Sequence, residues 1–194
     1  HSTNIKIQHF SNDGKITTLK ENISLLENEI IDASVMNKKK LISFLEKEIK
    51  EAKDTGILLS LHLKATMMKV SDPIIFGHVV SIFFADLVAK HKNIFSELGV
   101  DFKNGFGDLV EKINSLSSDK KSEILLDINQ AFKNNANLAM VNSEKGITNL
   151  HVPSDVIIDA SLPAMIRTSG QMWNSDNKTE DTKAIIPDSS YASV

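Results

Sequence analysis

The stretch that most constrains the fold is ILLSLHLK, residues 57–64, a continuous apolar run that directly follows a well-marked helix. That helix is predicted over residues 37–56, because Asn37 can cap its start and Gly56 can end it. Its apolar side chains recur at helical spacing, at Leu41, Leu45, Ile49 and Ala52. An apolar run without alternation is typical of a strand that is buried on both faces. A helix followed by a buried central strand predicts an α/β fold.

The first 36 residues have a different pattern. IKIQHF (5–10) and ITTLK (16–20) flank an Asp13-Gly14 pair, which predicts a β-hairpin with a turn at that pair. The next segment is ambiguous, and we expect a strand around residues 30–31. This part of the chain is therefore predicted to be a hairpin and strand region.

The rest of the chain alternates between helices and short strands. Helices are predicted over residues 73–99, from about 108, and over 119–135, with a strand at 138–143 and a polar loop at 174–183. We therefore expect a helix-rich region around the central strand at 37–135, followed at 138–194 by a strand, an acidic motif and a terminal loop.

Composition limits the class of protein. A chain of 194 residues with 41% hydrophobic side chains can bury the core of one sizeable domain. The formal net charge of −3 gives no electrostatic sign of a nucleic-acid partner. No apolar run approaches the roughly 20 residues that span a bilayer, so no membrane segment is expected. The absence of Cys excludes disulfides and thiolate catalysis, and a reducing cytoplasm is the expected compartment.

Two carboxylates stand four residues apart in the otherwise apolar stretch NLHVPSDVIIDASLPAMIR. If Ser154 caps a helix that Pro163 then limits, Asp155 and Asp159 lie about 6 Å apart, close enough to share one divalent ion. In a strand they would be about 13 Å apart. Two hard oxygen ligands favour Mg²⁺ or Mn²⁺ over zinc. Alternatively, Asp155 only stabilises a helix N-terminus, an explanation that suits Asp159 poorly because its neighbours are Ile and Ala.

Lys64 lies where the buried strand meets a loop, a usual position for catalytic groups in α/β folds. A partly buried Lys there can exchange protons near neutral pH, although structural Lys residues are commoner. His62 is predicted to face the same side of the strand and to be a satisfied core histidine, and Lys69 to be a solvated loop charge. His78 and His151 have no metal-ligand spacing with another His.

Basic charge is almost entirely lysine, since Arg167 is the only arginine of the chain. A pocket for a tricarboxylate, or for the 2′-phosphate of a nucleotide, normally needs several arginine forks. We therefore expect that this chain does not form such a pocket alone.

Four long strings carry a resemblance to a known family: LHLKATMMKVSDPIIFGHVV, ELGVDFKNGFGDL, LAMVNSEKGITNLHVPSDVIIDASLPAMIR and DTKAIIPDSSYA. Together they resemble the monomeric type of NADP-dependent isocitrate dehydrogenase. The resemblance covers nearly the whole chain and is strongest over 57–79 and 138–191. It implies an internal segment of the family's large second domain. It also implies part of an isocitrate/isopropylmalate dehydrogenase-like three-layer fold, with helices around a mixed sheet.

The resemblance carries over to few site residues. Lys64 matches the family's catalytic Lys beside the substrate hydroxyl, Asp159 matches a metal ligand, and Asp155 matches the neighbouring acid. The family's Ser, Asn and Arg contacts to isocitrate are expected before the first residue. Its catalytic Tyr, remaining metal acids and NADP-binding residues are expected beyond the last, and the terminal Tyr191 is not that Tyr. No NADP-binding residue is therefore expected in this chain.

The function that follows is oxidative decarboxylation of isocitrate with NADP and Mg²⁺ or Mn²⁺, by a monomeric parent enzyme. The chemistry needs an ion that chelates the hydroxyl and a carboxylate oxygen, a base for the hydroxyl proton, and an acid for the resulting enolate. This chain offers one base and one or two metal oxygens, so alone it is expected to be inactive. The alternative is a non-catalytic interaction or regulatory module derived from that enzyme. We also expect self-association, with ILLSL and AIIP as exposed strand edges.

Overall fold

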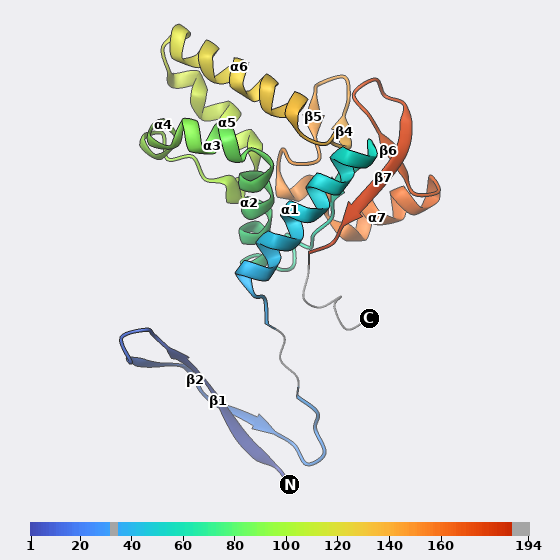
Figure 1. Ribbon diagram of the computed structural model, residues 1–194. Coiled ribbons are helices and arrows are strands. Elements are labelled where there is room, and N and C mark those ends of the chain that lie inside the picture. The colour runs from blue at the N-terminus through green and yellow to red at the C-terminus, as the bar shows by residue number, and fades with distance from the viewer. Residues whose placement is uncertain (32–34, 188–194) are drawn as a thin grey trace. The chain divides into compact units, whose positions relative to one another are not determined.

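The computed structural model describes residues 1–31 and 35–187 of the chain (Figure 1). The chain separates into two compact units, residues 1–35 and residues 36–194. Each unit has its own secondary structure, and the second unit holds the buried core. None of the described helices is long and apolar enough to cross a membrane.

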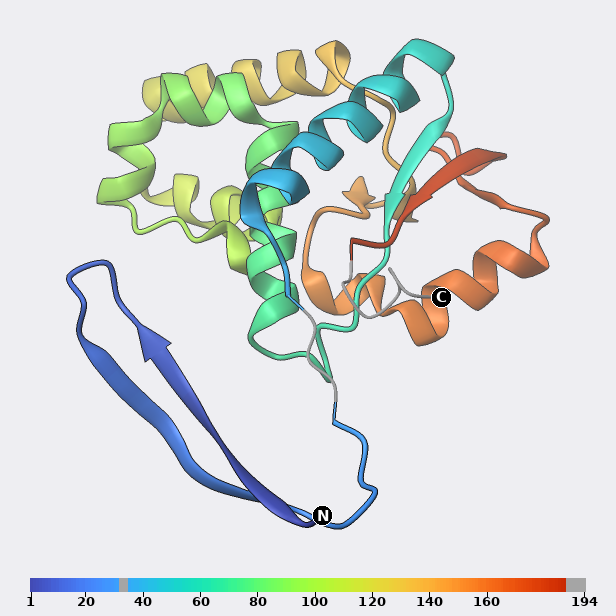
Figure 2. The ribbon, with the colours of Figure 1, turned by 60° about the horizontal axis from the view of Figure 1, so that its bottom comes forward.

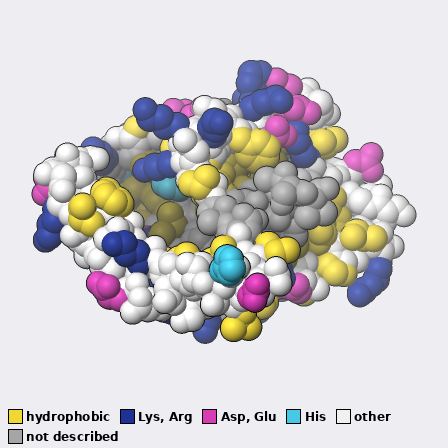
Figure 3. All heavy atoms as spheres, turned by 90° about the horizontal axis from the view of Figure 1, so that it is seen from below, with side chains coloured by type: hydrophobic (Ala, Val, Ile, Leu, Met, Phe, Trp, Pro, Cys, Tyr) yellow, Lys and Arg dark blue, Asp and Glu magenta, His cyan; other side chains and the backbone are white. Residues whose placement is uncertain are grey.

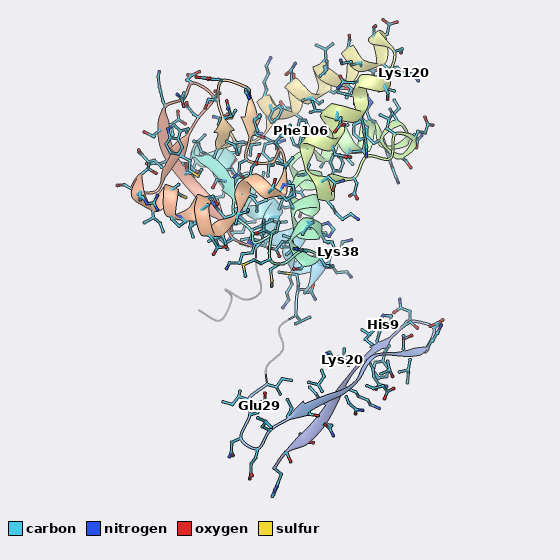
Figure 4. All side chains as sticks on the ribbon, turned by 180° about the vertical axis from the view of Figure 1, so that it is seen from behind. His9, Lys20, Glu29, Lys38, Phe106 and Lys120 are labelled. Carbon is cyan, nitrogen blue, oxygen red and sulfur yellow. The ribbon has the colours of Figure 1, made fainter. Side chains whose placement is uncertain are left out.

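The first unit is an antiparallel hairpin of β1 (Thr3–Phe10) and β2 (Ile16–Leu25), as predicted. The turn closes where the N–H of Gly14 donates to the carbonyl of Ser11 at 3.0 Å, with Gly14 at a φ of 81°. Side chains such as His9 and Lys20 project from a bare two-stranded ribbon (Figure 4). The strand predicted at residues 30–31 is wrong, because these residues have no ladder partner, and residues 32–34 lie outside the described part.

The predicted helix of the second unit is confirmed as α1 (Lys38–Thr55). The Asn37 side chain accepts a hydrogen bond from the backbone N–H of Lys40 at 3.1 Å, and Gly56 ends the helix at a φ of 69°. The helix buries the four predicted apolar positions, Leu41, Leu45, Ile49 and Ala52.

The apolar run after α1 forms β3 (Leu58–Leu61), in which every residue is buried, as predicted. It pairs in parallel with β7 (Thr179–Ile185), which pairs in antiparallel with β6 (Gln171–Trp173), so the sheet is mixed. Figure 2 shows α1 on one side of β3 and β7 and α7 (Ile158–Arg167) on the other. Ile185 of β7 belongs to the larger core with α1, whereas Ala184 packs on a smaller cluster with Met165 of α7.

Two expectations about this sheet are wrong. The predicted polar loop at 174–183 contains most of β7, because the turn from Asn174 to Lys178 joins it to β6 as a hairpin. ILLSL is not an exposed edge, since one side of β3 pairs with β7 and the other bonds to Asn137, Ala139 and Asn149. AIIP is engaged as well, because its first two residues pair with the last two of β3.

The single long helix predicted over residues 73–99 is also wrong. The chain forms three shorter helices instead: α2 (Ser71–Phe83), α3 (Ala85–Lys90) and α4 (Lys92–Glu97). Adjacent side chains on an unbroken helix point about 100° apart, yet Phe83 and Phe84 are both buried. The break at Phe84 lets both reach one aromatic cluster, in which Phe84 stacks on Phe106 with 4.3 Å between ring centroids. Packing of aromatic rings therefore overrides the helical pattern.

The remaining elements complete the second unit. They are η1 (Phe102–Asn104), α5 (Phe106–Lys112), η2 (Ile113–Ser115), α6 (Ser118–Asn134), β4 (Met140–Asn142), β5 (Ile147–Thr148) and η3 (Pro153–Val156). The helices predicted from about residue 108 and over 119–135, and the short strand within 138–143, are confirmed within a few residues. Basic and acidic side chains are interspersed on the face drawn in Figure 3.

Candidate functional site

The candidate site lies at the carboxyl end of β3, where the chain continues through His62, Leu63 and Lys64. Leu63 forms a parallel bridge with Ile157, just before α7. Its N–H donates to the carbonyl of Val156 at 3.0 Å, and its carbonyl accepts from the N–H of Ile158 at 2.7 Å. This short pairing brings the first turn of α7 beside the end of a central strand, where ligand and catalytic groups collect in α/β folds.

Lys64 and Asp159 meet at this point. The Nζ atom of Lys64 lies 3.1 Å from Oδ1 of Asp159, and their side chains are 27% and 55% exposed. A solvated ion pair of this kind contributes little to stability, typically below about 1 kcal/mol. The pair matters for chemistry, because it places an amine that can exchange protons beside a carboxylate that can bind a metal ion, at a site that solvent reaches.

The main chain of Lys64 is held on both sides. Its N–H donates to a carboxylate oxygen of Asp72 at 2.7 Å, and Asp72 is buried with 1% exposure at the start of α2. The Lys64 carbonyl accepts from the N–H groups of Met67 at 2.9 Å and Met68 at 2.7 Å. The buried carboxylate thus fixes the backbone from which the lysine side chain extends. No local sequence pattern indicated this role for Asp72.

Asp155 and Asp159 do not share one helix, so that prediction is wrong. Asp155 lies in the short η3 and Asp159 in the first turn of α7, with Ile157 between them in an extended conformation (φ −64°, ψ 117°). The cause is the pairing with Leu63, which holds Ile157 in this extended conformation between η3 and α7. The four-residue spacing therefore does not set a one-turn distance between the two acids.

Two other local expectations for this stretch are wrong. Ser154 is not a helix cap, since Val152 occupies the cap position of η3 without a side-chain hydrogen bond. Pro163 does not limit α7, which continues to Arg167. A proline lacks the N–H for one helical hydrogen bond, here to the carbonyl of Asp159. Met165, beyond Pro163, is buried in a cluster with Ala139 and Met172, and this packing stabilises the later part of the helix.

Asp155 itself is exposed. Within residues 1–31 and 35–187, no hydrogen bond or ion pair to its carboxylate is found. Its backbone N–H donates to the carbonyl of Val152 at 3.2 Å, as in a tight turn. Its carboxylate is thus open to solvent on the segment that leads into α7.

His62 is a satisfied core histidine, as predicted. It is fully buried, with Nδ1 2.7 Å from the hydroxyl oxygen of Ser161 and Nε2 bonded to the hydroxyl of Ser60. Burial lowers the pKa of His62 from 6.5 to about 4, because the charged ring would lose its hydration. The imidazole is therefore neutral near pH 7. Its bond to Ser161 links the end of the β3 segment to α7, two residues beyond Asp159.

A separate group of possible metal ligands, missed from the sequence, joins α3 to α6. Ligand atoms of His91, Glu123 and Asp127 lie within 4.8 Å of one another. The ammonium of Lys90 already lies among them, 2.7 Å from Asp127 and 3.4 Å from Glu123. Hydrogen bonds from Lys90, and then from His91, lower the pKa of Asp127. The group is thus explained as an ion-pair network between two helices, and the ligand set spans too much sequence for a spacing motif.

Comparison with known proteins identifies the family of this chain. The family description "Monomeric isocitrate dehydrogenase" matches residues 1–194. The chain belongs to this family. The resemblance of its long strings to the monomeric isocitrate dehydrogenases is therefore confirmed.

Individual members of the monomeric isocitrate dehydrogenase family match along essentially the full chain. Isocitrate dehydrogenase [NADP] 2 of Colwellia maris is 54% identical over 193 residues, which are 100% of this chain. Isocitrate dehydrogenase [NADP] of Azotobacter vinelandii is 55% identical, and that of Corynebacterium glutamicum 52% identical, each over 190 residues and 98% of this chain. In all three cases the match covers 26% of the relative. The chain thus spans about a quarter of the length of these relatives.

Proposed function

We propose that this chain is an internal part of a longer NADP-dependent isocitrate dehydrogenase, called the parent enzyme below. In it, Lys64 moves the proton of the substrate hydroxyl and Asp159 binds a divalent metal. The observation that carries the proposal is the 3.1 Å approach of Lys64 and Asp159 at the carboxyl end of β3. These are the two residues that match the family's catalytic lysine and metal acid. The relatives are named as NADP-dependent isocitrate dehydrogenases.

The donor set fits Mg²⁺ or Mn²⁺ in part. The Asp159 carboxylate is a hard oxygen donor, half exposed, and already beside one cation. Such ions usually take about six oxygens, so the other ligands come from the substrate and from elsewhere in the parent enzyme. Asp155 is proposed as a weaker contributor, through a hydrogen bond or a bound water. Its open carboxylate on the segment before α7 is compatible with that role.

We assign no NADP contact to this chain. Its single arginine, Arg167, is exposed at the end of α7. One arginine does not make the multi-dentate site that a nucleotide 2′-phosphate requires. NADP and the isocitrate carboxylates are therefore proposed to bind residues of the parent enzyme outside this chain.

The residues of this chain then have distinct tasks. The bound ion would polarise the substrate hydroxyl and stabilise the negative charge that develops during oxidation and decarboxylation. Lys64 would accept the hydroxyl proton as a base, and bound NADP⁺ would supply the hydride acceptor. Asp72 keeps the backbone of Lys64 in place, and this fixes the point from which the amine extends toward the substrate. Asp159 would supply an oxygen ligand to the ion, beside the Lys64 amine.

We assign the second unit to an isocitrate/isopropylmalate dehydrogenase-like three-layer fold, within the large second domain of the parent enzyme. The mixed sheet with helices on both sides supports this assignment. We also propose a monomeric parent enzyme in the cytoplasm, which agrees with the family's description as monomeric and with the absence of cysteine.

The rival proposal is a free-standing, non-catalytic module derived from the enzyme. Intact-mass measurement of the natural protein separates the two. A mass several times the 21.4 kDa of this chain supports the parent enzyme, and a mass near 21.4 kDa supports the module. The purified 194-residue chain is expected to form no NADPH from isocitrate. Formation of NADPH by this chain, free of longer enzyme, would contradict the proposed division of the site.

A further inference from the structure

We propose that His62 is a positioning residue for the candidate metal ligand. Through Ser161 it fixes the first turn of α7, and with it the Asp159 carboxylate, relative to Lys64. This inference rests on the proposed function. His62 is fully buried and acts through another residue, so it makes no contact with substrate.

The directions of the hydrogen bonds around His62 follow from the partners. The Ser161 hydroxyl lies 2.9 Å from the carbonyl of Ile157, which can only accept, so Ser161 donates its proton there. The oxygen of Ser161 must then accept from Nδ1–H of His62 at 2.7 Å. Nε2 consequently has no proton, and it accepts from the hydroxyl of Ser60. Both ring nitrogens are used, in a single tautomer.

This chain of bonds gives α7 a second attachment to the segment that directly follows β3. The first is the backbone bond from the N–H of Ile158 to the carbonyl of Leu63. The second, between Ser161 and His62, lies about one helical turn further along. One attachment fixes a point on a helix, whereas two a turn apart also fix its direction and its rotation. Asp159 lies between the two attached positions in sequence.

Three consecutive residues directly after β3 thus set the geometry of the site. His62 binds the helix through a side chain, Leu63 binds it through the backbone, and Lys64 meets its Asp159 carboxylate. Residues that orient a metal ligand from behind typically change metal affinity by about 10–100-fold when they are removed. Loss of the His62–Ser161 bond should therefore show up in metal binding, beyond any loss of stability.

The experiment measures the dissociation constant of Mn²⁺ alone for the parent enzyme, by electron paramagnetic resonance of the free ion. His62→Leu and Ser161→Ala are each expected to raise this constant about tenfold. The Mn²⁺ dissociation constant of the double variant should not exceed that of the single variant with the higher constant, because both changes remove the same bond. His62→Asn should recover most of the affinity, since its amide N–H can replace Nδ1–H. Ser161→Thr, which keeps the hydroxyl, should do the same.

Thr168 supplies a matched control at the other end of α7. Its hydroxyl contacts the carbonyls of Ala164 and Met165, at 3.2 and 2.9 Å, and that of Gln171. Thr168→Val removes a half-buried hydroxyl from the same helix, distant in sequence from Asp159. It is expected to lower the melting temperature and to leave the Mn²⁺ constant unchanged.

Unchanged Mn²⁺ constants in folded His62→Leu and Ser161→Ala would overturn the inference, as would additive effects in the double variant. If His62→Leu does not fold, the comparison of Ser161→Ala with Ser161→Thr decides, and equal constants for those two overturn it. If the wild-type parent enzyme binds Mn²⁺ and the variants give these results, only the positioning role of His62 is contradicted, and the proposed function stands. A wild-type protein that binds no Mn²⁺ and oxidises no isocitrate removes the proposed function and this inference together.

Discussion

The ammonium of Lys64 and the carboxylate of Asp159 lie 3.1 Å apart, although one lies three residues beyond the end of β3 and the other in the first turn of α7. Neither residue has a sequence neighbour that would demand this contact. The bridge between Leu63 and Ile157 creates it, because it brings the two segments together as neighbouring strands. A lysine and an acid that were singled out separately in the sequence thus form one site.

The first prediction concerns Lys64. In the parent enzyme, Lys64→Met is expected to lower kcat by about 100-fold or more, the usual scale for a positioned proton-transfer group. Folding should survive, because Met fills much of the same volume and the partly exposed ion pair stabilises little. Lys69→Met, in the exposed loop that follows, is the control and should keep normal kcat. Near-normal kcat in Lys64→Met would show that Lys64 is only structural.

The second prediction separates the two acids. Asp159→Asn should raise the Mn²⁺ concentration needed for activity of the parent enzyme much more than Asp155→Asn does. The reason is geometry, since only Asp159 is held beside Lys64 by an anchored helix, whereas Asp155 lies on a separate short turn. The measurement is a metal titration of activity for both variants. Equal effects, or a larger effect at Asp155, would reverse the roles.

The third prediction is a pH dependence of stability that comes from His62. The pKa of His62 is about 4 in the folded protein and 6.5 in the unfolded chain. Between these pH values the unfolded chain therefore binds more protons than the folded protein does. The stabilising contribution is therefore complete above pH 6.5 and falls as the pH drops toward 4, by about 3 kcal/mol in all. Urea unfolding of wild type and His62→Asn across this range should show that only the wild type loses this amount.

The matched control for this pH dependence is His9→Asn, which changes an exposed histidine of the hairpin. Its unfolding curve should follow that of the wild type at every pH. A wild-type free energy of unfolding that stays flat between pH 6.5 and 4 would contradict a neutral, buried His62.

The fourth prediction concerns Gly105, where the chain passes very close to a neighbouring segment. A Cβ atom there would lie 2.1 Å from the carbonyl oxygen of His151, and the φ of 96° disfavours other residues. Gly105→Ala should lower the free energy of unfolding by more than about 3 kcal/mol. Gly146→Ala, also at positive φ but with open space around it, should cost only about 1–2 kcal/mol. Equal losses in thermal unfolding would refute the close approach.

The fifth prediction is that the 194-residue chain self-associates in solution. The surface responsible is expected in the first unit, where large apolar side chains are exposed, at Ile7, Phe10, Ile16, Leu19, Leu26 and Ile30. Sedimentation should show concentration-dependent association, and Phe10→Ser with Leu19→Ser should weaken it. Leu126→Ser, an equally exposed leucine on α6 of the second unit, is the control. A strict monomer at high concentration would exclude this association.

Some elements follow from the sequence because their causes are local. Asn37 and Gly56 cap α1 through contacts within one turn, and the hairpin turn needs only Gly14 and its neighbours. The burial of β3 follows from its unbroken apolar run. The candidate residues Lys64 and Asp159 were also identified from the chain alone, by an acid in apolar surroundings and a lysine at a strand end, together with the family resemblance.

Other features depend on contacts with residues far away in the sequence, which no local pattern predicts. The helix breaks at Phe84 because this side chain stacks on Phe106 in a shared aromatic cluster. A polar stretch forms β7 because β3 and β6 pair with its backbone on both sides. The separation of Asp155 from Asp159 is set by Leu63. Sequence thus determined which residues are candidates for the site and which segments are buried, because side-chain type and short-range spacing decide these. The tertiary structure alone decided which groups meet, because distances between segments are fixed by pairing and packing across the whole chain.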